Sequence, residues 1–286
     1  QGVSLSDVSL GSMSDTAGFT EPDAISEFYG YSAVTGSDYY WLGDGVNDTL
    51  RFTGNSSDLY NTNTDFSWSG WYRIDETTSQ VQQFGSLSTS TPSGSNQIFL
   101  QYHGSLKRIL FRYRYNGSFH QRQYPLHDNL SITGVNSNGW YSTNRGNVNG
   151  DGFVHLVFTY DASDRNAATG LNVYWNAQKL TSSVSNSSVS SPTHWAARSV
   201  AIGDLVSSSP NNANVFKGGI DNVSVHSKVL TQSEITSLYN SGTPIQCNDA
   251  GVTSNILAEY RLENSSDNND GTWMDLVNSG GTYQTY

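Results

Sequence analysis

The feature that most constrains the fold is a strict alternation of side chains over residues 66–74. One set of alternate positions carries Phe66, Trp68, Gly70, Tyr72 and Ile74, and the other carries Ser67, Ser69, Trp71 and Arg73. Successive side chains of a β-strand point to opposite faces of a sheet, so this period of two indicates a strand with two distinct faces. Similar runs recur, separated by turn-forming Gly, Asn, Asp and Ser clusters. These runs are residues 97–103, 108–116, 153–161, 171–180, 198–205 and 218–227.

Composition favours the same fold class. The chain has 286 residues, of which 35% are hydrophobic and 12% aromatic, enough for a substantial core. Only 14% are charged, and Ser, Thr, Asn, Gly and Tyr are abundant, which is typical of many-stranded extracellular or particle-surface proteins. We therefore expect an all-β protein.

One short helix is expected within residues 230–242. Thr231 and Glu234 have the spacing of a capping box, and Gly242 is a candidate stop signal. The apolar face of this helix consists of Ile235, Leu238 and Tyr239. Many strands and one helix predict two packed antiparallel sheets with the helix lying against one of them.

Charge separates one region from the rest of the chain. The formal net charge of −11 argues against a nucleic-acid partner, because phosphate binding needs a basic face. Five cations nevertheless fall within sixteen positions, and they are Lys107, Arg108, Arg112, Arg114 and Arg122. An acidic protein thus carries one basic patch.

The basic patch overlaps the predicted strand at residues 108–116. On a strand, Arg108, Leu110, Arg112 and Arg114 share one face, and Ile109, Phe111, Tyr113 and Tyr115 share the other. We expect the aromatic face in the core and three guanidinium groups in a row on the water-facing side. Such a row can bind the carboxylates or sulfates of an acidic polysaccharide, pair with acidic residues of another subunit, or simply remain solvated.

Aromatic residues in predicted loops are a second set of candidate glycan contacts. Trp140, Tyr141, Trp195 and Tyr124 could stack on sugar rings, and the alternative for each is core filling. The first two lie in the polar run GVNSNGWYSTNRG, where they have few local neighbours to pack against.

Four segments in order resemble the laminin-G-like, concanavalin A-like lectin/glucanase jelly-roll domain. They are WLGDGVNDTLRF (41–52), DFSWSGWYRID (65–75), residues 152–180 and residues 215–242. The resemblance spans residues 38–243 and implies a sandwich of two curved antiparallel sheets, often used to bind glycans or proteins. The family includes enzymes and purely structural modules, so the fold alone does not decide the function.

The N-terminal segment has a second resemblance. VSLSDVSLGSM followed by AISEFYGYS is similar to the N-terminal segments of tailed-bacteriophage virion proteins. We interpret residues 1–37 as an attachment arm and residues 244–286 as a strand and loop tail that packs on the sandwich or on a neighbour. The aromatic cluster of the arm could dock on another subunit or cover the end of its own domain; it consists of Ile25, Phe28, Tyr29 and Tyr31.

The resemblance also implies a possible structural Ca²⁺. Asp44, Asp48 and Asp221 occupy positions where similar jelly rolls often hold such an ion, which takes carboxylate and carbonyl oxygens. The alternative is that Asp44 and Asp48 are turn residues and that Asp221 is a hydrogen-bond acceptor at a strand end.

Catalysis is not expected. Related glycanases place carboxylates on alternate positions of a strand, since the acid and the nucleophile must flank one sugar. The nearest candidates are Glu21, Asp23 and Glu27, which precede the sandwich, and Pro22 would interrupt a strand there.

The single Cys247 cannot form an internal disulfide.

These expectations combine into one functional prediction. The chain is predicted to be a non-enzymatic phage virion protein, a fibre, tail-associated adhesin or capsid decoration, whose jelly roll binds host or environmental polysaccharide on the virion surface. Its expected partners are other virion proteins and further copies of itself, and membrane insertion is not expected. The alternative is a secreted or cell-surface bacterial carbohydrate-binding module, and a polysaccharide-degrading enzyme is a third hypothesis.

Overall fold

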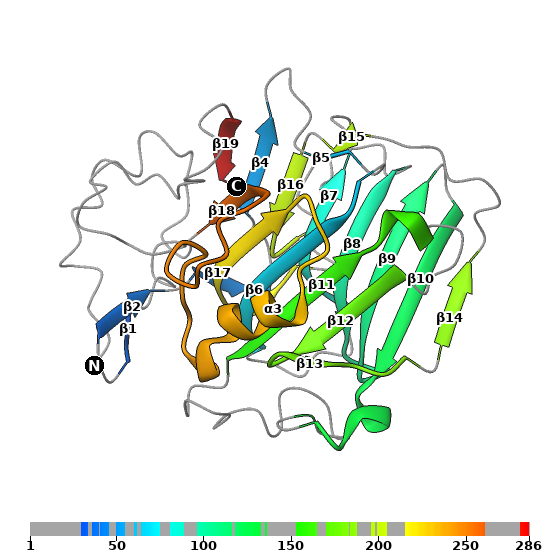
Figure 1. Cartoon of the computed structure of the whole chain (residues 1–286), viewed down its shortest axis with the longest axis horizontal. Helices are drawn as coiled ribbons and strands as arrows, with labels where there is room; N and C mark the ends of the chain where they lie inside the picture. The colour runs from blue at the N-terminus through cyan, green and yellow to red at the C-terminus, as the bar shows by residue number, and fades with distance from the viewer. Residues whose placement is uncertain are drawn as a thin grey trace.

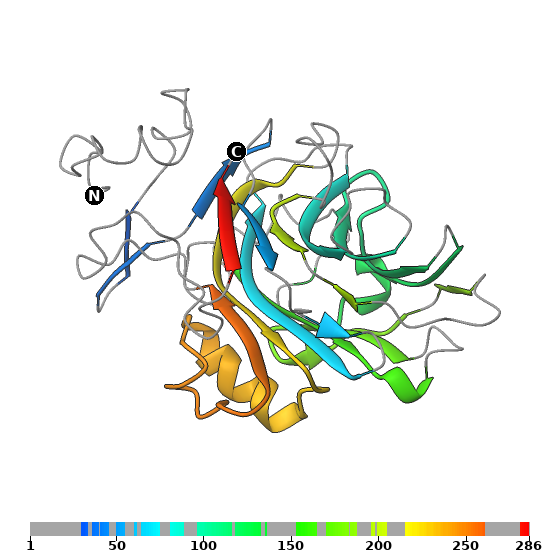
Figure 2. The same cartoon turned by 90° about the horizontal axis from the view of Figure 1, so that it is seen from above.

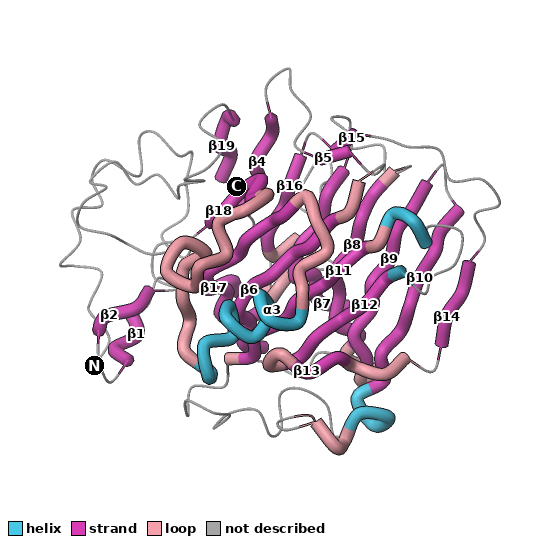
Figure 3. The backbone as a smooth tube through the Cα atoms, viewed as in Figure 1, coloured by secondary structure: helices cyan, strands magenta, loops and turns pink. Residues whose placement is uncertain are grey.

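A computed structural model provides the structure of the chain. The described residues are 30–33, 36–39, 41–45, 50–54, 60–61, 64–74, 81–88, 96–115, 118–132, 135, 153–164, 170–182, 184–187, 196–197, 199–204, 215–260 and 281–285. Strands make up most of this backbone (Figure 3). Within the described residues, no helix has the length and apolar character needed to cross a membrane.

One layer of the molecule is an eight-stranded antiparallel sheet. Its strands, in spatial order, are β14 (Val184–Ser187), β10 (Ser118–Pro125), β9 (Arg108–Tyr115), β8 (Gln97–His103), β7 (Val81–Ser88), β16 (Ser199–Ile202), β4 (Leu50–Gly54) and β19 (Gly281–Thr285). Strand β19 pairs with β4 at one edge, so the C-terminal tail adds a strand to this sheet.

The other layer is a seven-stranded antiparallel sheet. Its main path is β13 (Gln178–Lys179), β12 (Leu171–Trp175), β11 (Val154–Tyr160), β6 (Phe66–Ile74), β17 (Lys217–His226) and β18 (Ile256–Tyr260). Strand β3 (Trp41–Asp44) pairs with the first part of β17, and β18 pairs with its last part. The tail therefore contributes a strand to each sheet.

Two small sheets of two strands each account for the remaining described strands. β1 (Gly30–Ala33) pairs with β2 (Gly36–Tyr39), and β5 (Tyr60–Asn61) pairs with β15 (Ala196–Ala197). The first pair crosses the predicted boundary of the arm at residue 37, where the sequence showed no sustained alternation. Only the backbone is described for β1, β2, β4, β5, β14, β15 and β19.

The two sheets pack face to face (Figures 1 and 2). The alternation predicted for β6 is confirmed, because Phe66, Trp68, Tyr72 and Ile74 belong to one continuous buried core between the sheets. Trp68 Nε1 donates a hydrogen bond to the Tyr72 hydroxyl at 2.6 Å, which satisfies the polar end of a buried indole. A Cβ at Gly85 would overlap the Trp68 ring, so β7 needs glycine at this point of closest approach.

The predicted helix is α3 (Gln232–Tyr239), and its capping box is confirmed. Glu234 N donates to Thr231 Oγ1 at 3.3 Å, and Thr231 N donates to Glu234 Oε2 at 2.9 Å. The predicted stop at Gly242 is wrong, because the helix ends at Tyr239 and Asn240 adopts the left-handed conformation at the C-cap. Asparagine tolerates this conformation better than most residues, so it can replace the glycine signal.

Three short 3-10 turns are also described, at η3 (Leu126–Asn129), η4 (Ala162–Asp164) and η6 (Asn240–Gly242). The hairpin between β12 and β13 has a two-residue loop, Asn176 and Ala177, with φ of 47° and 61°. Positive φ at both loop residues is the geometry that matches the twist of paired strands.

Candidate functional site

Strands β8, β9 and β10 form a regular array of side chains on the outer face of the eight-stranded sheet. Their inward residues lie in the core; these are Ile98, Leu100, Tyr102, Ile109, Phe111, Tyr113 and Tyr124. The alternate residues therefore project outward, away from the seven-stranded sheet. We call these outward residues the outer array: Gln97, Phe99, Gln101, His103, Arg108, Leu110, Arg112, Arg114, Phe119, Gln121, Gln123 and Pro125.

Strand register arranges the outer array in rows across the sheet. Arg112 pairs with Phe99 on one side and with Gln121 on the other. Arg114 likewise lies between Gln97 and Phe119. The face thus alternates arginines, aromatic rings and amides, which are groups that donate and accept hydrogen bonds or stack.

The Arg112 side chain is held from three directions. Its Nε donates to Gln121 Oε1 at 3.1 Å. Its Cζ lies 5.8 Å from the ring centroid of Phe99 and 5.0 Å from that of Phe119. Two cation–π contacts and one hydrogen bond fix the guanidinium plane, while Nη1 and Nη2 form no hydrogen bond to another described residue.

The outer array is electropositive. It contains Arg108, Arg112 and Arg114 but no carboxylate, and none of the three forms an ion pair with a carboxylate in the described part of the chain. Burial lowers the pKa of Arg112, and the charge of Arg114 lowers it further. Burial also lowers the pKa of His103, with additional effects from Arg108 and Arg112. Like charges are therefore concentrated here without a described counter-charge.

Burial divides the outer array into a floor and a set of accessible groups. Gln97, Phe99, Gln101, Leu110, Gln121 and Pro125 are buried. The partly exposed members are His103, Arg108, Arg112, Arg114, Phe119 and Gln123. Arg108, Arg112 and Arg114 lie on the outer face, where the strand alternation predicts them, but their side chains are only partly exposed and Leu110 between them is buried.

The structure also divides the basic patch seen in the sequence. Arg122 lies at an inward position of β10, where Nη1 donates to Leu171 O at 3.2 Å and to Asn172 Oδ1 at 3.1 Å. Its guanidinium lies over the Tyr124 ring. Lys107 occupies the exposed turn between β8 and β9. Arg122 is thus a structural bridge to β12, and it does not belong to the outer array.

The model of the laminin G family described as "Concanavalin A-like lectin/glucanases superfamily" matches residues 43–236, well over half of the chain. The protein belongs to the concanavalin A-like lectin/glucanases superfamily. The match lies within the predicted span of 38–243. No curated protein sequence matches the chain.

Solved structures similar to this superfamily member were also found. A heptameric SAP-like pentraxin from Limulus polyphemus is 12% identical, with a TM-score of 0.46, 84% of this chain covered and 89% of the other. A putative carbohydrate binding protein from Bacteroides ovatus is 13% identical, with a TM-score of 0.45 and coverages of 84% and 60%. Domains LG4-5 of the mouse laminin alpha1 chain are 14% identical, with a TM-score of 0.43 and coverages of 70% and 46%.

The candidate calcium ligands of this concanavalin A-like protein lie at different places. Asp221 is buried in the middle of β17, beside a bulge, and its Oδ1 accepts a hydrogen bond from Asn222 N at 2.8 Å. Asp44 is opposite Lys217, four residues earlier on β17, so its Cα lies roughly 13 Å along the ladder from Asp221. That separation argues against one ion shared by Asp44 and Asp221. The Asp44 side chain and all of Asp48 lie outside the description, and no cluster of metal-ligating side chains occurs among the described residues.

Several other predicted residues lie away from the site or outside the described part of the chain. The stacking role expected for Tyr124 is wrong, because this side chain is fully buried in the core between the sheets. Trp140, Tyr141 and Trp195 lie outside the described residues, as do Glu21, Asp23, Ile25, Glu27, Phe28 and Tyr29. Tyr31 is a residue of β1, of which only the backbone is described.

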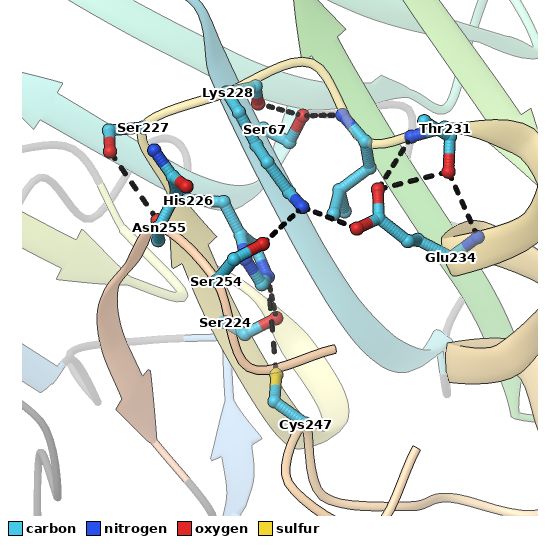
Figure 4. A network of polar contacts seen from close by, with 11 residues as sticks. Ser67, Ser224, His226, Ser227, Lys228, Thr231, Glu234, Cys247, Ser254 and Asn255 are labelled. Atoms are coloured by element: carbon cyan, nitrogen blue, oxygen red, sulfur yellow. Dashed lines mark hydrogen bonds and ion pairs between the residues drawn. The ribbon is translucent and has the colours of Figure 1, made fainter. Parts of the chain in front are cut away.

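The outer face of the seven-stranded sheet carries a different polar cluster, beneath α3 and the segment that follows it (Figure 4). His226 Nε2 lies 3.0 Å from Ser224 Oγ and 4.0 Å from Cys247 Sγ. Cys247 N donates to Glu259 Oε1 at 2.7 Å. These four residues are all buried, so their histidine, thiol and carboxylate tie the C-terminal segment to the sheet and are not presented to a substrate.

The functional residues that the sequence analysis missed are Phe99, Phe119 and Gln121. Phe99 lies at an outward position of the predicted strand at residues 97–103, whereas Phe119 and Gln121 lie on β10, a strand that the sequence analysis did not predict. The register was missing as well, because only the pairing of β8 and β10 with β9 places these residues beside Arg112.

Proposed function

We propose that the protein is a non-catalytic glycan-binding module and that the outer array is its binding face. Membership of a superfamily that contains lectins supports this proposal. The chemistry of the array supports it as well, because amides and guanidinium groups match the hydroxyl and acidic groups of sugars, and aromatic rings match their C–H faces.

One observation carries the proposal. Arg112 is fixed between Phe99 and Phe119, with Nε oriented by Gln121 and its two Nη groups directed to no other described residue. A preorganised polar group on a half-buried face loses little conformational freedom on binding, which favours affinity.

The array offers no machinery for glycoside hydrolysis. That reaction needs two carboxyl groups on either side of the scissile bond, about 5 Å or 6.5–9.5 Å apart. The outward residues of β8, β9 and β10 include no Asp or Glu. Binding without cleavage is the function that these residues support.

We further propose that the module is displayed on a phage particle, as a fibre, tail-associated adhesin or capsid decoration. The resemblance of residues 1–32 to virion proteins supports this location. Several weak sites on one oligomeric particle would gain avidity. The alternative, a secreted or cell-surface bacterial carbohydrate-binding module, uses the same binding face. Mass spectrometry of purified particles separates the two, since only a virion protein would remain at constant stoichiometry through particle purification.

The binding function is tested with protein displayed multivalently on a sensor surface and a panel of neutral and acidic polysaccharides. We expect saturable binding to at least one polysaccharide and a loss of at least tenfold in Phe119→Ala, which removes a partly exposed ring of the array. The control is Lys179→Gln, an exposed residue of β13 in the other sheet. Absence of binding by folded protein, or equal binding by Phe119→Ala, contradicts the proposal.

Thermal unfolding with and without a chelator tests a second proposal, a structural Ca²⁺ held near Asp44 and Asp48. Addition of a chelator should lower the melting temperature if an ion is held near Asp44 and Asp48. The affinity for polysaccharide should change only to the extent that the chelator unfolds the protein. An unchanged melting temperature would count against the ion.

A further inference from the structure

We infer that the ligand of the outer array is a glycan carrying an oxyanion, either a carboxylate or a sulfate ester, and that Arg112 binds this oxyanion through Nη1 and Nη2. This inference rests on the proposed function and specifies its ligand class. Nothing in a neutral sugar requires a fixed guanidinium, whereas an oxyanion matches its two parallel N–H groups.

The first argument is the direction of the Arg112 donors. Nε already donates to Gln121, and Cζ lies within 6 Å of the ring centroids of both Phe99 and Phe119. Nη1 and Nη2 are therefore the donors that remain for a ligand. The hydrogen bond and the two ring contacts restrict the side chain, so a carboxylate or one edge of a sulfate meets a fork of two donors whose position is already restrained.

The second argument is the charge around this fork. Arg114 is two residues away on the same face, at roughly 7 Å between Cα atoms, and Arg108 is four residues away, at roughly 13 Å. His103, opposite Arg108 on the neighbouring strand, adds an imidazole beside these three guanidinium groups. A chain of net charge −11 thus gathers three guanidiniums on one face with no described carboxylate between them. A bound anion would relieve this repulsion.

The third argument concerns the class of anion. Nucleic acid also carries oxyanions, but a protein of net charge −11 repels a dense row of phosphates everywhere outside this one face. A glycan with one charge per repeat places anions at intervals and hydroxyl groups between them. The amides of Gln121 and Gln123 and the ring of Phe119 suit those intervening groups.

The experiment compares chemically matched polysaccharides on the full-length chain. Polygalacturonate is paired with its carboxyl-reduced form, and dextran sulfate is paired with dextran. We expect at least tenfold tighter binding to one charged member than to its uncharged partner, with affinity falling as salt rises. The carboxylate and sulfate pairs distinguish the two sources of oxyanion.

Two substitutions at one position test the fork itself. Arg112→Gln should lose at least tenfold in affinity for the charged polysaccharide, and Arg112→Lys should recover only part of it because lysine keeps the charge without the paired donors. Lys179→Gln, which removes the same charge from the opposite sheet, should bind as the unmodified protein does. If Arg112→Gln fails to fold, the polysaccharide pairs still decide the question, and Arg114→Gln tests the charge of the face.

Three results would overturn the inference. Equal affinity for charged and uncharged members of both pairs, with Phe119→Ala still defective, would show glycan binding without an oxyanion and leave the proposed function intact. Competition by single-stranded DNA at the same charge concentration would show the wrong class of anion. Absence of binding to every polysaccharide would overturn the proposed function together with this inference.

Discussion

The outer faces of the two sheets are both polar, but one is covered by other segments of the chain and the other is partly exposed. Both carry polar side chains: serines, histidines and an aspartate on the seven-stranded sheet, and glutamines and arginines on the eight-stranded sheet. On the first, α3 and the following segment cover the strands, and Val157, Leu230, Ile235, Leu238, Cys247 and Val252 form a second buried cluster. On the second, the arginines remain partly exposed.

On the covered outer face of the seven-stranded sheet, polar side chains hold the chain segments that lie over the strands. Ser67 Oγ donates to Lys228 O at 2.7 Å and accepts from Leu230 N at 2.9 Å, which fixes the chain as it enters the helix (Figure 4). Lys228 Nζ contacts Glu234 and also donates to Ser254 Oγ at 2.8 Å. These atoms of Ser67 and Lys228 have internal partners, whereas the Nη groups of Arg112 have none among the described residues. Buried Nδ1 atoms of His155 and His226 also lack a hydrogen-bond partner in the described part of the chain, but α3 and the following segment cover them, so no ligand reaches them. We call this covered outer face of the seven-stranded sheet the sealed face.

The largest expected effect is acid destabilisation of the sealed face. Burial lowers the pKa of His155 to about 3 and that of His226 to about 4. Unfolded histidine titrates near 6.5, so below that pH the unfolded state binds more protons, and stability falls as pH falls until the folded pKa is reached. Each histidine should contribute a loss of about 1.4 kcal/mol per pH unit, or about 2 kcal/mol by pH 5.

Urea unfolding from pH 8 to pH 5 measures this loss, and hydrogen exchange locates it. Peptides from β11 and α3 should lose protection before those from β8 and β9. His226→Gln should reduce the slope of stability against pH. A stability that stays flat from pH 8 to pH 5 would contradict the burial of both imidazoles.

The next effect compares one residue from each face. Ile235→Ala removes a fully buried side chain of α3 and should cost about 3 kcal/mol, because it leaves a cavity over Val157. Arg112→Gln should cost less than about 1 kcal/mol, since the group is partly exposed and makes one hydrogen bond. Urea midpoints of the two variants decide the comparison, and equal losses would mean that the outer array is as structural as the sealed face.

A smaller effect concerns the cap of α3. Thr231→Ala removes the side chain of the capping box and should lower the free energy of unfolding by about 1 kcal/mol. Thr236→Ala is the matched control, because its hydroxyl bonds only to Gln232 within the helix, donating to Gln232 O and accepting from Gln232 Nε2. Thermal unfolding of the two variants should therefore differ, and an equal shift would argue against the cap as the source.

The smallest expected effect lies on the binding face. A bound oxyanion would offset the charges of Arg108 and Arg112 that help to lower the pKa of His103. His103 would then take up a proton on binding, so affinity for dextran sulfate, if that probe binds, should rise a few-fold from pH 7.5 to pH 5.5. His103→Gln should remove this pH dependence, and a dependence that survives the substitution must come from another group.

Local sequence patterns predicted much of this fold correctly. Alternation located β6, β8 and β9 almost to the residue, and the capping box located the start of α3, because strand faces and helix caps depend on neighbours only a few residues away. The same alternation placed Ile109, Phe111 and Tyr113 in the core. It also placed Arg112 on the outward face.

Tertiary structure alone decided which outward residues meet and which are covered. Register placed Phe99, Phe119 and Gln121 around Arg112 and turned Arg122 inward, although all five lie within 24 positions of sequence. Packing of α3 buried Ser67 and His155 on a face whose pattern alone would have suggested exposure. The sequence by itself determined the faces of each strand through local backbone geometry. Whether each face is covered or open depended on long-range strand pairing and on whether α3 and the segment after it pack over that face. Neither of these is encoded within a single strand.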